Sequence, residues 1–346
     1  MSVGSWYRGA YLKEKATRLS PGAFRRLAVV SLVAVCLIVL TGAAVRLTGS
    51  GLGCPDWPSC YHTAVTPQLS LHPLVEFSNR MVTVALVVLL AVTFLGALCR
   101  RPFRGDLTWI ATGLLAGVVA QALIGALAVY TKLNPYVVLL HFLASMVLVA
   151  LAVILVHRAG RDHRVAGRAL VGRPLMWSTR GAATLLGLVL VAGTFTTGTG
   201  PHAGNAGGQL VARRIPVALR DMAELHSSLA VLLIGLLIGL AVALHVTDVP
   251  EALRRKARVL VVVVMLQGVI GYVQYFTHLP AALVELHILG ATALVAATAD
   301  LVVSLVHHPR EVQATRPALA PAPRSFEPAA GRVAGFEPRS EHAPIV

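Results

Sequence analysis

Charged residues are scarce in this sequence. They occupy 13% of its 346 positions, whereas soluble globular domains contain about 25%. This deficit, together with a hydrophobic content of 56%, excludes an intrinsically disordered chain and argues against a soluble enzyme. Cysteine is also rare, and four cysteines are too few for a disulfide scaffold. Acidic residues are half as numerous as basic ones, and the net charge of +15 raises the question of nucleic-acid binding.

Long apolar runs are what the sequence has in abundance. A helix needs about 20 apolar residues to cross the hydrocarbon core of a bilayer, and eight runs have about this length. They cover residues 27–46, 75–99, 107–130, 135–157, 181–200, 222–245, 257–277 and 282–307. The sequence therefore predicts an all-α integral membrane protein with eight transmembrane helices. The first run lacks an Ala-x-Ala cleavage site, so we expect no cleaved signal peptide.

The basic residues gather on one side of the predicted helices. Of the 30 lysines and arginines, all but six lie before the first helix, in every second loop or in the tail. The six exceptions are Arg46, Arg80, Lys132, Arg213, Arg214 and Arg220. Because Lys and Arg favour the cytoplasmic side, we expect both termini in the cytoplasm and a multi-pass protein in the cell membrane. Topology then explains the basic excess, so membrane lipid and not nucleic acid is the expected neighbour.

An internal repeat relates the two parts of the chain. Residues 121–150 and 267–296 align without a gap and share 12 of 30 positions. The matched pairs include Gln121 with Gln267, Gly125 with Gly271 and His141 with His287. Two four-helix bundles inserted in the same orientation, a parallel repeat, are therefore expected.

This repeat gives the predicted domain organisation. The predicted parts are a cytoplasmic segment 1–26, a first half 27–157, a cytoplasmic linker 158–180, a second half 181–307 and a tail 308–346. The tail is rich in Pro, Ala, Arg and Glu, a composition typical of disorder.

Three histidines lie well inside predicted spans, where polar residues are costly and usually functional, whereas His157, His245 and His307 stand at the cytoplasmic ends of theirs. His141, His226 and His287 stand near the starts of the fourth, sixth and eighth helices, so the topology places them at similar depth on the outer side. Two neutral imidazoles from facing helices of an apolar bundle suit the axial ligation of haem iron. His226 and His287 therefore predict a bis-histidine site in the second half. Isolated polar residues that bond to neighbouring helices are the alternative interpretation.

The first half breaks this symmetry at Asn79, which stands opposite His226 in the repeat. Asparagine is a poor iron ligand, so this half would hold a porphyrin through His141, alone or with another group. Glu76 shares the helical face of Asn79. It is either a solvated residue favoured by the helix dipole or a carboxylate at the porphyrin edge that acts as base or cation stabiliser. His202, in TGPHAG, is a further candidate for propionate binding or proton handling.

Two of the four cysteines lie in the first outer loop, GSGLGCPDWPSC. Under the predicted topology, Cys54 and Cys60 face an oxidising compartment, where a disulfide persists. A structural staple is favoured over a thiol–disulfide redox role. Cys36 and Cys99 are most simply packing residues.

Taken together, residues 27–307 resemble the haem A synthase family. The resemblance rests on TGSGLGCPDWPSC, the element Glu76-x-x-x-Arg80, the repeated QxxIG…H pattern and TGTGPHAG. It implies an oxidoreductase that converts the C8 methyl of haem O to a formyl group, giving haem A. It further implies a haem b cofactor on His226 and His287, a substrate haem on His141, a catalytic carboxylate at Glu76 and a loop cysteine pair at Cys54 and Cys60.

The chain departs from the family pattern Glu-x-x-His-Arg at Asn79. With one axial ligand, the sixth position of the substrate iron stays open. We therefore expect a five-coordinate substrate haem with Asn79 as a distal hydrogen-bonding group.

Partners follow from the implied reaction. A very apolar haem would otherwise have to diffuse through lipid, so haem O synthase, the protohaem farnesyltransferase, is an expected partner. A redox partner, which the sequence does not name, is also required, and a homo-oligomer is left open.

Two other functions use the same features. A dihaem b-type electron-transfer protein would use the same histidines, but it favours two six-coordinate haems, which Asn79 does not provide. A transporter is suggested by the repeat, but the halves are parallel and show no pair of broken helices.

Overall fold

In the computed structural model, the described residues are 19–62, 65–161, 167–204 and 212–307, and eight long helices account for most of them. These are α2 (Pro21–Leu47), α3 (Leu71–Cys99), α4 (Gly105–Tyr130), α5 (Pro135–Ala159), α6 (Arg173–Thr199), α7 (Leu219–Val246), α8 (Glu251–Phe276) and α9 (Ala281–Ser304). Each has the length and apolar composition needed to cross a membrane. The predicted all-α membrane fold is therefore confirmed. The tail, predicted to be disordered, lies outside the described residues.

Several helices begin before their apolar run does. Helix α2 begins at Pro21, where the side chain of Ser20 accepts the backbone N–H of Ala23 at 3.2 Å. Helix α6 begins at Arg173, inside the predicted linker. Hydropathy marks only the part of a helix that lies in hydrocarbon, whereas the helical hydrogen bonds continue into the interface. Proline in the first turn of both helices fits this start, because its missing N–H would be unpaired there anyway.

The last helix ends earlier than predicted, at Ser304. The next residues form β2 (Val306–His307), which pairs antiparallel with β1 (Arg168–Ala169). This small sheet joins the segment after α5 to the segment after α9. A strand of two residues carries no detectable hydrophobic period, so the sequence did not indicate it.

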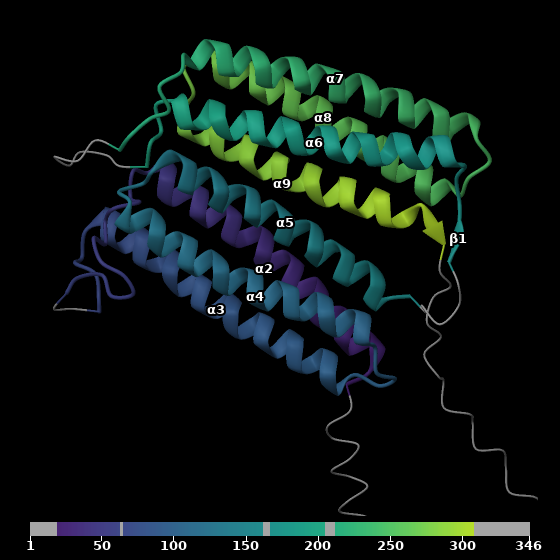
Figure 1. Ribbon diagram of the computed structural model, residues 1–346, viewed down its shortest axis with the longest axis horizontal. Helices are drawn as coiled ribbons and strands as arrows, with labels where there is room; N and C mark the ends of the chain where they lie inside the picture. The colour runs from purple at the N-terminus through teal and green to yellow at the C-terminus, as the bar shows by residue number, and fades with distance from the viewer. Residues whose placement is uncertain (1–18, 63–64, 162–166, 205–211, 308–346) are drawn as a thin grey trace, which may run out of the picture. The chain divides into compact units, whose positions relative to one another are not determined.

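The helices pack as two rings of four (Figure 1). In the first bundle, α2 to α5, each helix contacts the next and α5 returns to α2. In the second bundle, α6 to α9, the same order of contacts recurs and α9 returns to α6. Helices α2 and α5 face α6 and α9, with contacts from α5 to both and from α2 to α9. The parallel-repeat relation between the bundles remains a prediction.

Two turns at equivalent positions share an uncommon backbone. Lys132 and Leu133 follow α4 with φ of 53° and 59°, and His278 and Leu279 follow α8 with φ of 64° and 60°. Positive φ is uncommon for residues other than glycine. In both turns the second residue donates its N–H to a carbonyl of the preceding helix at 2.7 Å. The alignment of these two segments therefore extends to their backbone conformation.

Side-chain packing is uneven along the helices. We call the end that carries the Cys54–Cys60 loop the disulfide end. The buried residues of α5, α7 and α9 all lie away from this end, from Met146, Leu233 and Thr292 onward respectively. Protein interiors are normally close-packed. The tight core thus occupies the opposite end, and inward-facing side chains of these three helices remain partly accessible at the disulfide end.

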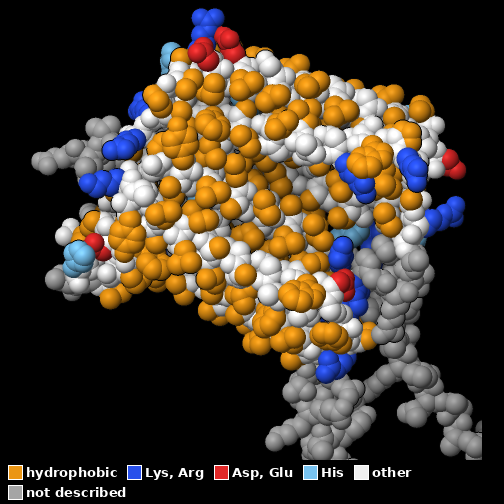
Figure 2. All heavy atoms as spheres, in the orientation of Figure 1, with side chains coloured by type: hydrophobic (Ala, Val, Ile, Leu, Met, Phe, Trp, Pro, Cys, Tyr) orange, Lys and Arg blue, Asp and Glu red, His pale blue; other side chains and the backbone are white. Residues whose placement is uncertain are grey.

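Hydrophobic side chains cover the lateral surface of the helices. Figure 2 shows them over the visible face, with Lys and Arg toward the helix ends. Val33, Val88 and Leu232 are each about 60% exposed (61%, 58% and 60%). Contiguous apolar surface of this extent marks contact with an apolar phase, which agrees with helices that lie in a bilayer.

Candidate functional site

The three intramembrane histidines lie at the disulfide end of their helices. His141 on α5, His226 on α7 and His287 on α9 each precede the buried residues of the same helix. Each continues the inward-facing stripe at helical spacing. The histidines therefore face the partly accessible interior of the bundles.

His226 and His287 face each other across the second bundle. Their ring centres are 6.3 Å apart, with an edge-to-face angle of 79°. A bond from a metal to an imidazole nitrogen is about 2 Å long, so two imidazoles on opposite sides of one ion have their centres about 6 Å apart. The spacing therefore fits two axial ligands of a single iron.

The second nitrogen of His226 is positioned by the neighbouring helix. Its Nδ1 lies 3.0 Å from the carbonyl oxygen of Val189 on α6. A carbonyl only accepts, so Nδ1 carries the proton and Nε2 keeps its lone pair. Metal-bound histidines commonly donate their other N–H in this way. The Nδ1 atoms of His141 and His287 are buried without a hydrogen-bond partner among the described residues.

Each histidine ring lies beside a glycine of an adjacent helix. A Cβ added at Gly193 would be 2.9 Å from Cε1 of His226. The corresponding distances are 3.4 Å from Gly271 to His287 and 3.7 Å from Gly125 to His141. At Gly193 a side chain would displace the imidazole. The matched glycines of the repeat therefore make room for the rings.

A buried glutamine holds the backbone at His141. Nε2 of Gln121 on α4 donates to the carbonyl of His141 at 2.8 Å and to Oγ of Ser145 at 2.5 Å. In the second bundle, Gln267 packs directly against Gly290, where a Cβ would overlap its amide. Gln121 thus fixes α5 against α4 at the level of its histidine.

Asn79 occupies the inward stripe of α3 and bonds to α2. The hydroxyl of Thr41 donates to Oδ1 of Asn79 at 2.8 Å. Among the described residues, the amide nitrogen of Asn79 has no hydrogen-bond partner. A Cβ added at Gly42, the residue that matches Gly193, would meet no heavy atom within 4 Å. The first bundle therefore has open space where the second holds an imidazole.

Glu76 is buried, not solvated, with 5% of its surface exposed. It accepts the N–H of Cys54 at 2.8 Å and an N–H of Arg80 at 2.6 Å. Arg80 also donates to the carbonyls of Cys54, Asp56 and Ser59 at 2.8–3.1 Å. The Glu76–Arg80 pair therefore joins α3 to the loop above it. The catalytic assignment of Glu76 stays a prediction.

The outer loop is closed by the predicted disulfide between Cys54 and Cys60, and both cysteines are buried. A Cβ at Gly53 would lie 2.5 Å from the carbonyl of His72, so only glycine lets the start of α3 pack here. This approach brings the N–H of Cys54 to Glu76. Cys36 and Cys99 are free.

Arg46 links the two bundles at the disulfide end, and His202 joins the segment after α6 to the turn after α8. Nε2 of His202 lies 2.8 Å from the carbonyl oxygen of Leu279, in the turn after α8. Arg46, at the end of α2, donates to the carbonyls of His202 and Thr197 at 2.8 and 2.9 Å. The sequence indicates Arg46 only as a cation on the outer side. A single arginine near the end of an apolar run gave no sign of this long-range contact.

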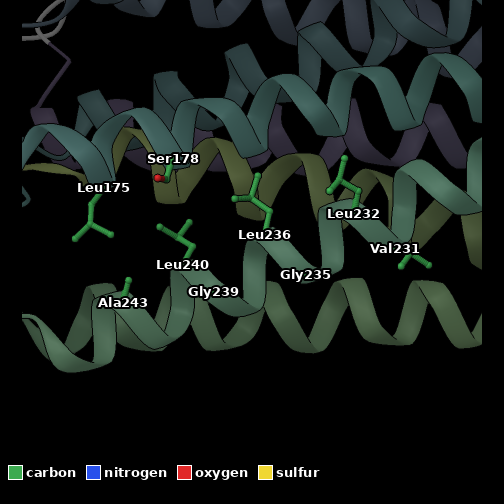
Figure 3. A pocket seen from close by; sticks show the side chains of 9 residues that line it. All are labelled: Leu175, Ser178, Val231, Leu232, Gly235, Leu236, Gly239, Leu240 and Ala243. Atoms are coloured by element: carbon green, nitrogen blue, oxygen red, sulfur yellow. The ribbon is translucent and has the colours of Figure 1, made fainter.

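The structure also has an apolar groove of about 560 Å³ between α6 and α7 (Figure 3). Leu175 and Ser178 line it from α6, and Gly235 and Gly239 from α7. The groove contains no histidine, cysteine or charged residue. It is therefore separate from the histidine sites.

The fold and these side chains define a membrane protein of two helical bundles whose paired imidazoles suit haem ligation. The model of one family, COX15-CtaA, cytochrome oxidase assembly protein, matches residues 25–299. The chain belongs to this family.

Proteins named haem A synthase are among the relatives of this chain. The protein of Bacillus pumilus is 31% identical over 51% of this chain and 59% of its own length. That of Geobacillus thermodenitrificans is 37% identical over 30% of this chain and 33% of its own length. That of Bacillus cereus (strain 03BB102) is 27% identical over 80% of this chain and 91% of its own length. The chain thus spans less than two thirds of the first two relatives.

Proposed function

We propose that this protein is a haem A synthase, an enzyme that oxidises the C8 methyl of haem O to a formyl group. The observation that supports the proposal is that this family member contains two different histidine sites, one in each bundle. The second bundle presents two facing imidazoles, His226 and His287. The first presents one imidazole, His141, and a buried carboxylate, Glu76.

A haem b fits the second bundle as resident cofactor. His226 and His287 would hold it, and it would supply one-electron redox chemistry. The carbonyl of Val189 fixes the tautomer of His226, and Gly193 and Gly271 give the rings their space.

The first bundle would bind the substrate haem through His141. Gln121 positions this histidine through its backbone. The negative charge of Glu76 is balanced by Arg80, and its carboxylate offers more acceptor sites than its two hydrogen bonds use. Glu76 would take up a proton from the methyl group or stabilise positive charge that develops there.

The oxidation proceeds from methyl to hydroxymethyl and then to a hydrated aldehyde that loses water. With water as the source of oxygen, each of the two oxidations adds the oxygen of one water molecule to the substrate carbon and releases two electrons and two protons, so a redox partner has to accept the electrons. Haem O synthase is proposed as the protein that delivers the substrate. The basic loops support a protein of the cell membrane with its disulfide end outside and both termini in the cytoplasm.

Haem extraction tests this function. The full chain is expressed in a host that makes haem O but no haem A, and the extracted haems are separated and weighed by mass spectrometry. Haem A or its hydroxymethyl precursor is expected, and the Glu76→Gln variant should give neither. A folded, haem-loaded protein that yields only haem B and unchanged haem O, with a redox partner supplied, would contradict the proposal. That result would favour the dihaem electron-transfer alternative, which the names of the relatives do not favour.

A further inference from the structure

The two bundles differ at a position that the sequence alignment pairs, which is Asn79 in the first bundle and His226 in the second. His226 fills the space beside Gly193 and donates to a carbonyl of α6. Asn79 instead accepts from Thr41 on α2, and the space beside Gly42 stays open. The second bundle thus holds an imidazole ring at this position, whereas the first holds the shorter amide of Asn79 beside open space.

The Thr41 hydroxyl also sets the direction of the Asn79 amide. Because it donates to Oδ1 at 2.8 Å, the amide nitrogen is turned away from it. That nitrogen has no acceptor among the described residues and remains free to donate. Gly42 continues the inward stripe of α2 that includes Val35, Val39 and Val45, so the open space lies on the inner side of the helix.

We infer that Thr41, Gly42 and Asn79 form a binding site for a small neutral ligand on the open axial side of a haem that His141 holds. Steric access and a hydrogen-bond donor on the distal side decide whether such a ligand binds to haem iron. Gly42 provides the access and Asn79 the donor. The second bundle excludes such a ligand, because His226 and His287 occupy both sides. This inference deepens the proposed function and rests on its assignment of a substrate haem to the first bundle.

Carbon monoxide is the probe for this site. The full-length protein is purified in detergent with both haems bound, reduced, and its absorption is recorded before and after addition of carbon monoxide. One haem is expected to bind carbon monoxide and one to remain low-spin. In Asn79→His, the carbon monoxide-reactive fraction should disappear and a second low-spin signal should replace it.

The neighbouring Ser78→His variant is the matched control. Ser78 is exposed on the outer side of α3, so an imidazole there cannot reach the interior and carbon monoxide binding should persist. A wild-type protein with two low-spin haems and no carbon monoxide binding would overturn the inference. Failure of the first bundle to load haem, or an unchanged response in Asn79→His, would do the same.

The two proposals can fail separately. Carbon monoxide binding that is lost in Asn79→His, without any haem A formed by the wild type, supports this site and counts against the synthase. Haem A formed by a protein whose two haems are both low-spin supports the synthase and overturns the site.

Discussion

The carboxylate of Glu76 and the guanidinium of Arg80 are 2.6 Å apart, one turn apart on α3, with only 7% and 13% of their side chains exposed. The same guanidinium donates to four carbonyls of the Cys54–Cys60 loop. One side chain thus fixes both the carboxylate and the loop that covers it. A lysine cannot replace it, because its ammonium is a compact point charge without the planar fork of donors.

Replacing Arg80 by lysine should therefore impair the site while the helices remain folded. Each charge-assisted hydrogen bond that is lost contributes about 1.5–3 kcal/mol, and haem A formation should fall about tenfold or more. Extracted haem, weighed by mass spectrometry, measures the effect. Arg220→Lys is the control, because Arg220 forms the same type of pair with Glu224 on an exposed face. Equal yields from both variants would refute the positioning role.

Removing the disulfide should cost stability more than activity. The double variant Cys54→Ser, Cys60→Ser releases a short loop, and the loss is expected to be about 2 kcal/mol. Arg80 still holds the loop carbonyls, so haem A formation should exceed that of Arg80→Lys. Thermal unfolding of the purified protein measures the stability, with Cys99→Ser as control at a free, exposed cysteine. Loss of haem A formation in a folded variant would contradict this prediction, and a redox role for the disulfide would then be the alternative.

The glycines beside the histidines should differ in their tolerance of a methyl group. Gly193→Ala places Cβ 2.9 Å from Cε1 of His226, so it should displace the ring and remove the low-spin haem of the second bundle. Gly42→Ala meets no atom within 4 Å and should leave that haem in place. Reduced-minus-oxidised spectra and the ratio of haem to protein distinguish the two. A normal low-spin haem in Gly193→Ala would argue against His226 as a ligand.

Gln121→Leu should weaken the first site alone. The variant removes the hydrogen bonds of the Gln121 amide to the carbonyl of His141 and to Ser145, each of which contributes about 0.5–1.5 kcal/mol. The hydroxyl of Ser145 still donates to that carbonyl, but α5 is free to shift. Haem occupancy of the first bundle should fall while the low-spin spectrum of the second is unchanged. Leu123→Ala, on the exposed face of the same helix, should have no effect. An equal loss of both haems would point to general unfolding instead.

His202 is expected to be a structural residue. His202→Ala removes the hydrogen bond to Leu279 and should lower stability by about 1 kcal/mol without changing either haem spectrum. His202→Gln, which keeps a donor, should recover most of the loss. Thermal unfolding and optical spectra test both statements. A changed haem spectrum in a stable His202→Ala protein would favour the propionate-binding role.

The sequence predicted where the helices lie and that three histidines lie near the same end of their helices, because both follow local patterns. Apolar runs mark spans by length, and the repeat marked His141, His226 and His287 together. Helix starts such as Arg173 were missed because hydrogen bonding continues where hydropathy ends. The partners of the site residues were also missed. Thr41 and Asn79 are 38 residues apart in sequence, and Arg46 and His202 are 156 apart, so no local pattern reports either contact.

The close-packed end of the helices has a consequence for assembly in the cell. Because Leu233, Leu237, Leu240 and Leu244 and their neighbours form a core away from the histidines, we expect the chain to insert and gather its helices before any porphyrin arrives. Haem would then enter a preassembled protein and stabilise it by binding only the folded state. Membrane insertion of this protein would therefore not require haem, whereas the stability of the inserted protein would increase with the haem supply.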